Sequence, residues 1–209
     1  MIYNIGMTGG IGSGKNAAAA LFEKQGFYTI DSDQSGRTVM AKGGSAYDEI
    51  ISYFGNDILY PDGEIDRAAL GNIVFKDSGK RKILENIVHP AILAEEKRIR
   101  GQLRGKDDKA VIITHAALII EAGNAKKYDA LIVVTADTET RIKRITARDN
   151  ISAEKAQAVI KAQISDEERL KHADIIIDNS GNEDNLEKEV KRAADLIKTM
   201  NYGEKHSGR

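Results

Sequence analysis

Short runs of apolar residues alternate along this chain with longer segments in which apolar residues recur every three or four positions. The short runs are rich in β-branched or aromatic residues and are bounded by Gly, Asp or Asn, which is typical of buried strands. They predict five strands, at residues 3–7, 27–30, 111–114, 130–135 and 175–177. The longer segments predict helices at residues 15–25, 138–148, 153–171 and 183–200. This alternation indicates a parallel sheet with helices on both faces.

The stretch between the second and third predicted strands has a different pattern. It shows helical periodicity, with turns at Gly43-Gly44 and Pro61-Asp62-Gly63, and no convincing buried strand. We interpret residues 32–109 as a helical insertion. An insertion beside the carboxyl edge of a parallel sheet is well placed to hold a second substrate.

Composition narrows the function further. The chain has 209 residues, 41% of them hydrophobic and 30% charged, which is enough for a substantial core in one domain. Because 31 Lys and Arg nearly balance 32 Asp and Glu, we expect neither nucleic acid nor a membrane surface as a partner. The absence of Cys excludes disulfides, thiolate metal sites and cysteine nucleophiles. No signal-peptide pattern or membrane-spanning apolar run is present, so we expect a cytoplasmic protein.

A glycine-rich motif between the first predicted strand and the first predicted helix is the strongest functional feature. Its residues are Gly9, Gly10, Ile11, Gly12, Ser13, Gly14 and Lys15. Gly9, four residues and then Gly14-Lys15 form the spacing of a P-loop, in which consecutive backbone amides point at a phosphate. The helix N-terminus adds partial positive charge, and Lys15 would reach the β- and γ-phosphates. The alternative is a glycine-rich turn with an exposed lysine, but strand, loop and helix in this order favour nucleotide binding.

The expected nucleotide contacts extend past the lysine to Asn16 and Ala17. Asn16 stands where a P-loop normally has a Ser or Thr whose hydroxyl ligates magnesium. Its amide oxygen can serve as a neutral metal ligand, directly or through water, or it can leave the metal poorly held. Thr114 and His115 end the third predicted strand, where many P-loop proteins have an acidic residue that orients the magnesium shell. The motif therefore supports nucleotide binding more strongly than catalysis, with ATP and Mg²⁺ as the expected cofactors.

Two carboxylates and an arginine follow the second predicted strand, which we expect beside the strand that leads into the loop. Asp31, Asp33 and Arg37 form an Asp-x-Asp-x-x-x-Arg segment that resembles dephospho-coenzyme A kinases. Further matches follow in the order of that family: Phe54-Gly55, Asp62-Gly63, Asp66-Arg67, His89-Pro90, Leu118 to Glu121, Arg144, Arg148-Asp149, Gln163, Glu168-Arg169-Leu170 and Asp178-Asn179. The resemblance covers almost the whole chain.

This resemblance implies an α/β fold of the P-loop NTPase type, a parallel five-stranded sheet flanked by helices. It implies a single kinase domain, residues 1–209, whose core comprises residues 1–31, 110–137 and 172–200. The helical substrate-binding insertion would lie at about 32–109 and a helical lid at about 138–171. The implied reaction is ATP-dependent phosphorylation of the ribose 3′-hydroxyl of dephospho-coenzyme A, a small-molecule substrate, in the last step of coenzyme A synthesis.

The resemblance also implies roles for single residues. Asp33 would be the general base, Lys15 the cation at the γ-phosphate, and Arg148 a lid arginine that neutralises developing charge. Arg144 would join it at the nucleotide. The candidates for substrate contact are Asp31, Arg37, Arg67 and His89.

Each of these roles has a structural alternative. Asp31 and Asp33 can simply cap a helix that starts near Gln34, since Asp is a favoured N-cap residue. His89 can belong to a turn before Pro90 or pack against its neighbours. Arg141, Arg144 and Arg148 recur at spacings of three and four, which also describes a solvated helix face.

Two other functions remain open at this point. The first is another small-molecule kinase of the same architecture, acting on a nucleoside monophosphate or a metabolite hydroxyl. The second is a nucleotide- or coenzyme A-binding protein that has lost turnover. Asn16 favours this second alternative, whereas Lys15, Asp33 and Arg148 oppose it.

Overall fold

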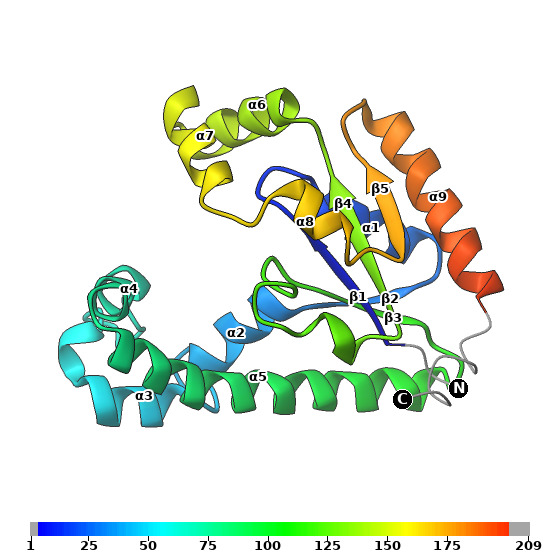
Figure 1. Ribbon diagram of the computed structural model, residues 1–209. Helices are drawn as coiled ribbons and strands as arrows, with labels where there is room; N and C mark the ends of the chain where they lie inside the picture. The colour runs from blue at the N-terminus through cyan, green and yellow to red at the C-terminus, as the bar shows by residue number, and fades with distance from the viewer. Residues whose placement is uncertain (1–3, 201–209) are drawn as a thin grey trace. The chain divides into compact units, whose positions relative to one another are not determined.

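The computed structural model describes residues 4–200, which form two compact units. The first unit contains the described residues up to Ile30 and from Lys106 onward, and the second is Asp31–Gly105. A five-stranded parallel sheet forms the centre of the first unit, as predicted (Figure 1). Its strands are β1 (Asn4–Gly9), β2 (Tyr28–Asp31), β3 (Ile112–His115), β4 (Ala130–Thr135) and β5 (Ile175–Asp178).

The strand order is β2-β3-β1-β4-β5, which corrects one expectation. The second strand does not lie beside the P-loop strand, because β3 pairs with β1 and separates the two. Met7 and His115 are partners in this register. Strands consecutive in sequence often pair, but a doubly wound sheet reverses its order at a switch point, which no local pattern encodes. The end of β3 therefore adjoins the start of the glycine-rich loop.

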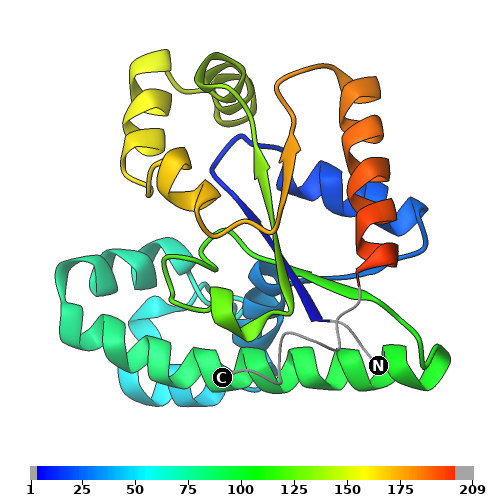
Figure 2. The same cartoon turned by 45° about the vertical axis from the view of Figure 1, so that its right-hand side comes forward.

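Side chains that alternate along each strand build a separate core on each face of the sheet. In β4, Ile132 and Val134 face a core shared with α1 (Lys15–Lys24) and α9 (Glu183–Thr199). Leu131 and Val133 point to the opposite face, where Ile119 from the segment after β3 packs against them. Figure 2 shows α9 alongside the sheet. The period of two residues in a strand explains this division.

The segment from 138 to 171 is helical but is not built as predicted. It contains α6 (Thr138–Asp149), α7 (Ala153–Lys161) and the short α8 (Asp166–Leu170). The expected single helix 153–171 is wrong, because the chain leaves the helix after Lys161 and begins α8 at Asp166. Ser165 caps α8 by accepting a hydrogen bond from the Glu168 amide at 3.1 Å. Ser165-x-x-Glu168 is a capping pattern that marks a helix start.

The second unit, whose residues are all described, is built from helices around its own apolar core. It contains α2 (Ser32–Met40), α3 (Tyr47–Phe54), α4 (Arg67–Lys76), most of α5 (Ser78–Lys106) and the short 3₁₀ turn η1 (Asn56–Ile58). Ile50, Ile58, Leu70 and Val88 are among the buried residues of the core. An isolated antiparallel bridge joins Leu59 to Ile65 around the predicted turn at Pro61. Pro90 is accommodated inside α5.

Between residues 4 and 200, no helix combines the length and the apolar character needed to cross a bilayer.

Candidate active site

The glycine-rich loop joins β1 to α1 and presents the N-terminus of that helix. Gly14 is the N-cap residue, has a left-handed φ of 89° and supplies no side-chain cap. The first intrahelical acceptor is the Gly14 carbonyl, which receives the Ala18 amide at 3.0 Å. Amides in the first turn of a helix have no acceptor within the helix, and together with the helix dipole they form a binding site for anions. The predicted phosphate site thus has the required backbone.

Lys15 contacts both residues at which the motif departs from the usual pattern. Its Nζ donates to Oδ1 of Asn16 at 3.1 Å and lies 3.0 Å from Nδ1 of His115. His115 is buried at the end of β3, whereas Asn16 is exposed. An ammonium group only donates, so Nδ1 accepts here and the imidazole proton is assigned to Nε2. Two neutral side chains therefore orient the ammonium group of Lys15.

The protein ligands available for a metal are few in this region. Across residues 4–200, no group of three or more His, Asp or Glu side chains is arranged to hold a metal ion. Asn16 offers one neutral amide oxygen in the first turn of α1. Magnesium in nucleotide sites takes most of its ligands from phosphates and water, so this donor set fits such an ion without a protein cage. Asn16 as a magnesium ligand stays a prediction.

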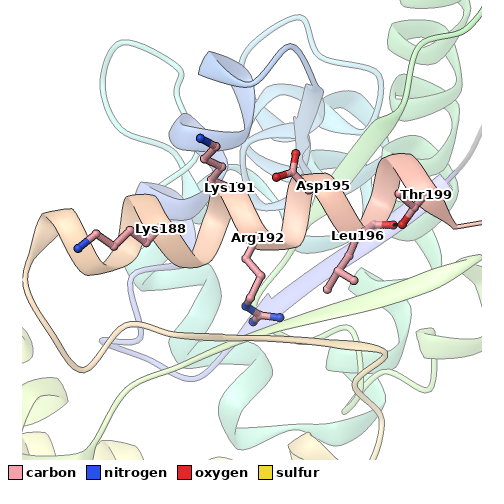
Figure 3. A pocket seen from close by; sticks show the side chains of 6 residues that line it. All are labelled: Lys188, Lys191, Arg192, Asp195, Leu196 and Thr199. Carbon is pink, nitrogen blue, oxygen red and sulfur yellow. Dashed lines mark hydrogen bonds between the residues drawn. The ribbon is translucent and has the colours of Figure 1, made fainter.

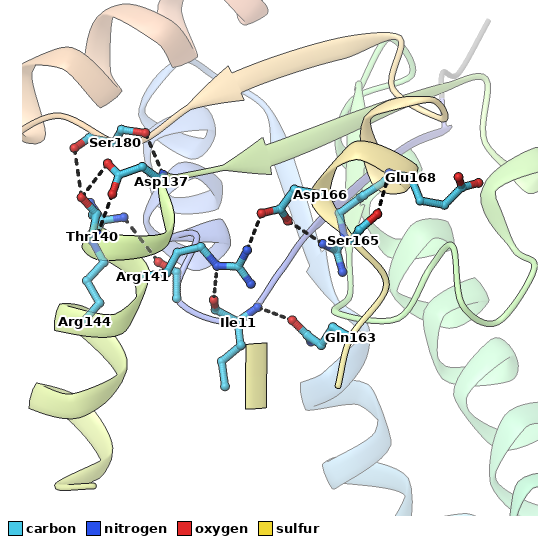
Figure 4. Close-up of polar contacts among 12 residues, drawn as sticks. Ile11, Asp137, Thr140, Arg141, Arg144, Gln163, Ser165, Asp166, Glu168 and Ser180 are labelled. Carbon is cyan, nitrogen blue, oxygen red and sulfur yellow. Dashed lines mark hydrogen bonds and ion pairs between the residues drawn. The ribbon is translucent and has the colours of Figure 1, made fainter. Parts of the chain in front are cut away.

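The main chain of the loop is held by side chains from distant parts of the first unit (Figure 4). The Ile11 amide donates to Oε1 of Gln163 at 2.8 Å, and the Ile11 carbonyl accepts from Nε of Arg141 at 2.8 Å. Nδ2 of Asn179 donates to the Ser13 carbonyl, also at 2.8 Å. A Cβ at Gly10 would lie 2.5 Å from Nη2 of Arg141, so any larger residue at this position would displace that guanidinium group. Tertiary contacts therefore set the conformation of the loop.

Arg141 belongs to a network of two buried arginines and two partly exposed carboxylates. Arg141 donates to Oδ2 of Asp166 at 2.6 Å, and Arg169 donates to Oδ1 of the same carboxylate at 2.9 Å. Arg169 also pairs with Glu121 at 3.1 Å. The side chains of the two arginines are 3% and 1% exposed. Such desolvated guanidinium groups need these partners, because an unpaired charge in the interior is very costly. The network joins α6, α8 and the segment after β3 to the loop.

The two candidate lid arginines occupy different environments. Arg144 is half-buried, with Nη1 3.4 Å from the Gly12 carbonyl and Nη2 3.4 Å from Oδ1 of Asn179. Arg148 lies in the last turn of α6 and makes two hydrogen bonds to Asp149, at 2.7 and 2.8 Å. These bonds raise the pKa of Arg148 above its usual range and lower the pKa of Asp149. The structure thus brings Arg144 to the loop, and Arg148 is exposed with its neighbour as partner.

The start of α6 is fixed by a cap next to the end of β5. Asp137 is the N-cap residue and accepts from the Thr140 amide at 2.7 Å. Its own amide donates to Oγ of Ser180 at 2.9 Å. The hydrogen bonds from Thr140, first from its amide, lower the pKa of Asp137. This cap sets the position of the helix that carries Arg141 and Arg144.

The second unit holds the other predicted residues. Asp31 is the N-cap residue of α2 and accepts from the Gln34 amide at 3.0 Å, so the capping interpretation is correct for Asp31. Asp33 is exposed in the first turn of that helix and is not its cap. Nη2 of Arg67, at the start of α4, donates to the Arg37 carbonyl at 3.1 Å. His89 is exposed within α5, so the turn and packed interpretations of His89 are both wrong.

Sequence reasoning assigned no role to three residues that contact the loop, Arg141, Gln163 and Asn179. It also assigned none to Asp166, which pairs with Arg141, or to Arg169, which pairs with Asp166. Gln163, Arg169 and Asn179 stand in segments that carry the family resemblance, which was the available signal. Arg141 lay in the arginine stripe of α6, for which a solvated face was an alternative. That alternative is wrong for Arg141, because this side chain is buried.

A shallow pocket on the outer side of α9 is separate from the loop (Figure 3). Its lining consists of Lys188, Lys191, Arg192, Asp195, Leu196 and Thr199. Arg192 donates to the Ile176 carbonyl at 2.6 Å, so it covers part of the outer edge of β5. No loop residue lines this pocket, and a charged side chain over a sheet edge is a common protection against unwanted strand pairing.

A parallel sheet whose first strand leads through a glycine-rich loop into a helix defines the class of P-loop nucleotide-binding proteins. A family model described as dephospho-CoA kinase matches residues 3–185 of this chain. The chain therefore belongs to the dephospho-CoA kinase family, as the resemblance of its motifs had indicated. It is a kinase, as the members of that family are.

Curated relatives match this chain over nearly their whole length. A dephospho-CoA kinase of Geobacter sulfurreducens is 42% identical over 186 residues, which cover 89% of this chain and 94% of the relative. One of Fusobacterium nucleatum is 40% identical over 196 residues, covering 94% and 99%.

Solved structures are similar as well. A crystal structure from Thermus thermophilus has a TM-score of 0.78 at 28% identity and covers 95% of this chain and 98% of its own. The dephospho-CoA kinase from Campylobacter jejuni has a TM-score of 0.59 at 30% identity, with coverage of 94% and 97%. Both likenesses extend over the two compact units.

Proposed function

We propose that this chain transfers the γ-phosphoryl group of ATP to the ribose 3′-hydroxyl of dephospho-coenzyme A, which gives coenzyme A and ADP. The observation that carries the proposal is the family match over residues 3–185, which includes the complete glycine-rich loop and Lys15. In this reaction the 3′-oxygen forms a bond to the γ-phosphorus while the bond from that phosphorus to the β,γ-bridging oxygen breaks. The hydroxyl proton has to leave as the new bond forms.

We assign the proton to the carboxylate of Asp33. Support comes from the Asp-x-Asp-x-x-x-Arg segment and from the place of Asp33 in the first turn of α2, directly after a strand of the sheet that carries the loop. Asp31 is occupied as a helix cap and is less suited to the role. Arg37 lies one helical turn beyond Asp33 and, with Arg67 and His89, is proposed to contact the substrate.

Three cationic side chains are proposed to stabilise the negative charge on the transferred phosphoryl group. Lys15 stands at the N-terminus of α1, Arg144 at the loop carbonyls and Arg148 on the last turn of α6. Phosphoryl transfer has a loose transition state, so catalysis depends mostly on positioning and on cations around the equatorial oxygens. Arg148 has to exchange Asp149 for a phosphate, which is feasible because exposed ion pairs are weak.

Magnesium, when bound, neutralises charge on the β- and γ-phosphate oxygens. Asn16 is the residue that we propose at the ion, directly or through water, because its amide oxygen stands at the position of the usual hydroxyl ligand. Oδ1 of Asn16, which accepts from Lys15, would then also face the metal or one of its waters. A cytoplasmic location and Mg²⁺ as a cofactor stay predictions.

The alternative of a binding protein without turnover rested on Asn16. The comparisons give this alternative no support, because the matching family model and both curated relatives are named as kinases.

A coupled assay of ADP release tests the proposal. It offers dephospho-coenzyme A, adenosine and AMP as acceptors in parallel, with Lys15→Ala as the control for background ATPase activity. We expect turnover with dephospho-coenzyme A alone, confirmed by mass spectrometry of the coenzyme A product, and none in the Lys15→Ala variant. Preference for adenosine or AMP would replace the substrate assignment. ATP binding without transfer to any acceptor would revive the binding-protein alternative.

A further inference from the structure

Two carbonyl groups of the loop accept hydrogen bonds from side chains that lie outside it. The Ile11 carbonyl accepts from Arg141 and the Ser13 carbonyl from Asn179, each at 2.8 Å. In a trans peptide the C=O of one residue points opposite to the N–H of the next. A carbonyl held on the outside therefore turns the following amide to the inside of the loop, where a P-loop binds phosphate. For Ser13, the amide that is turned in this way belongs to Gly14.

Asn179 is built into the fold in a way that fixes its side chain. It follows β5 directly, its amide donates to the Thr135 carbonyl at 2.8 Å, and the residue is 4% exposed. Because the Ser13 carbonyl only accepts, the side-chain atom that faces it is the NH₂ nitrogen. A Cβ on Gly14 would lie 2.1 Å from this nitrogen, so any other residue at 14 would displace the Asn179 amide group and would also be strained by the positive φ.

We infer that Asn179 is a positioning residue of the nucleotide site. It acts through Ser13, by holding the Ser13–Gly14 peptide with the Gly14 amide turned toward the phosphates. The inference rests on the proposed function only in so far as the loop binds ATP. A merely structural role is the competing explanation, since loss of a buried hydrogen bond also lowers stability.

Two substitutions at this position and one control separate these explanations. Asn179→Asp keeps the shape but places an oxygen against the Ser13 carbonyl, and Asn179→Ser is neutral and too short to reach it. The control is Asn182→Ala, three residues further on. Asn182 caps α9 by accepting from the Asn185 amide at 3.0 Å, so its loss destabilises the same unit at a place away from the loop.

The experiment measures ATP affinity by calorimetry and the thermal midpoint on the same samples. Loss of a buried donor predicts a Kd for ATP that is roughly 10- to 100-fold higher in both variants of Asn179. Asn182→Ala should lower the midpoint with the Kd unchanged.

Three results would overturn the inference. The first is a Kd within about twofold of the unchanged protein in both Asn179 variants. The second is an equal loss of affinity in Asn182→Ala. The third is a loss confined to Asn179→Asp, which would indicate repulsion of the phosphates by the new charge. If the unchanged protein binds ATP but does not phosphorylate dephospho-coenzyme A, the proposed function fails while the effect of Asn179 on ATP binding still decides this inference.

Discussion

The carboxylate of Asp166 is the connection on which the stability of the loop's support depends. It accepts from two guanidinium groups, Arg141 at 2.6 Å and Arg169 at 2.9 Å. Replacing it by Asn removes one negative charge between two buried cations. The amide can accept through its oxygen, but its NH₂ group must face the second guanidinium, which is also a donor. We therefore expect Asp166→Asn to destabilise the protein and to loosen Arg141 from the Ile11 carbonyl.

The magnitude follows from the burial of the partners. Removing one partner of a fully buried ion pair costs about 3–5 kcal/mol, and a lost hydrogen bond to a charged group costs about 1.5–3 kcal/mol. Asp166 itself is 35% exposed, so water will solvate part of the site. A loss of about 2–3 kcal/mol in the free energy of unfolding is expected, or roughly 5–10 °C in the thermal midpoint of a domain of this size.

Thermal denaturation followed by circular dichroism measures this loss. The matched control is Glu139→Gln, which also changes a carboxylate to an amide. Glu139 forms an ion pair within α6, with Nζ of Lys143 at 2.8 Å. That pair is 74% and 80% exposed, so no measurable shift is expected. Equal midpoints for Asp166→Asn and the unchanged protein, or equal losses in both variants, would contradict this prediction. Either result would show that burial of the arginines does not increase the contribution of the Asp166 ion pairs to stability.

Four further predictions concern the reaction and its pH dependence. Asp33→Asn should lower kcat about 10²-fold, the lower end for a general base, with ATP affinity unchanged; a full-speed variant would exclude the role. Asn16→Ser should restore turnover at lower magnesium if the amide is a poor ligand. A tenfold gain in rate would correspond to about 1.4 kcal/mol at the transition state. An unchanged rate across a magnesium titration would show instead that the site accommodates Asn. Arg148→Ala should reduce kcat roughly 10²-fold, while Asp149→Asn, which removes only an exposed partner, should leave kcat nearly unchanged; equal losses would contradict the lid role. The lowered pKa of Asp137 means that its stabilisation is present above the usual Asp pKa and is lost as pH falls through the lower folded pKa. In urea titrations, the difference in stability between the unchanged protein and Asp137→Asn should therefore be full at pH 7 and should begin to shrink only below about pH 4; a difference that does not depend on pH would contradict this.

Local patterns were sufficient for the parts of this protein that are built from neighbours in sequence. All five strands and the start of α1 lie within a few residues of their predicted places, because alternation, β-branched runs and the glycine spacing act over short distances. The family assignment was also readable, since its motifs are local and occur in a fixed order. The expected single helix 153–171 missed the break between Lys161 and Asp166, although the capping pattern at Ser165 was visible, because helical periodicity continues on both sides of that break.

Only the tertiary structure decided which distant residues support the loop. The order of strands in the sheet put β3 beside β1, and this brought His115 to Lys15. The spacing of the arginines in α6 could not predict that Arg141 is buried, because a solvated row of arginines and a buried one have the same helical period. The difference depends on which distant segments pack against the helix. Asn179 is 166 residues from Ser13 in the chain, and no local rule relates the two. The sequence by itself thus determined that a phosphate loop forms, whereas the fold determined how its peptide groups are held, because that depends on donors supplied from other strands and helices.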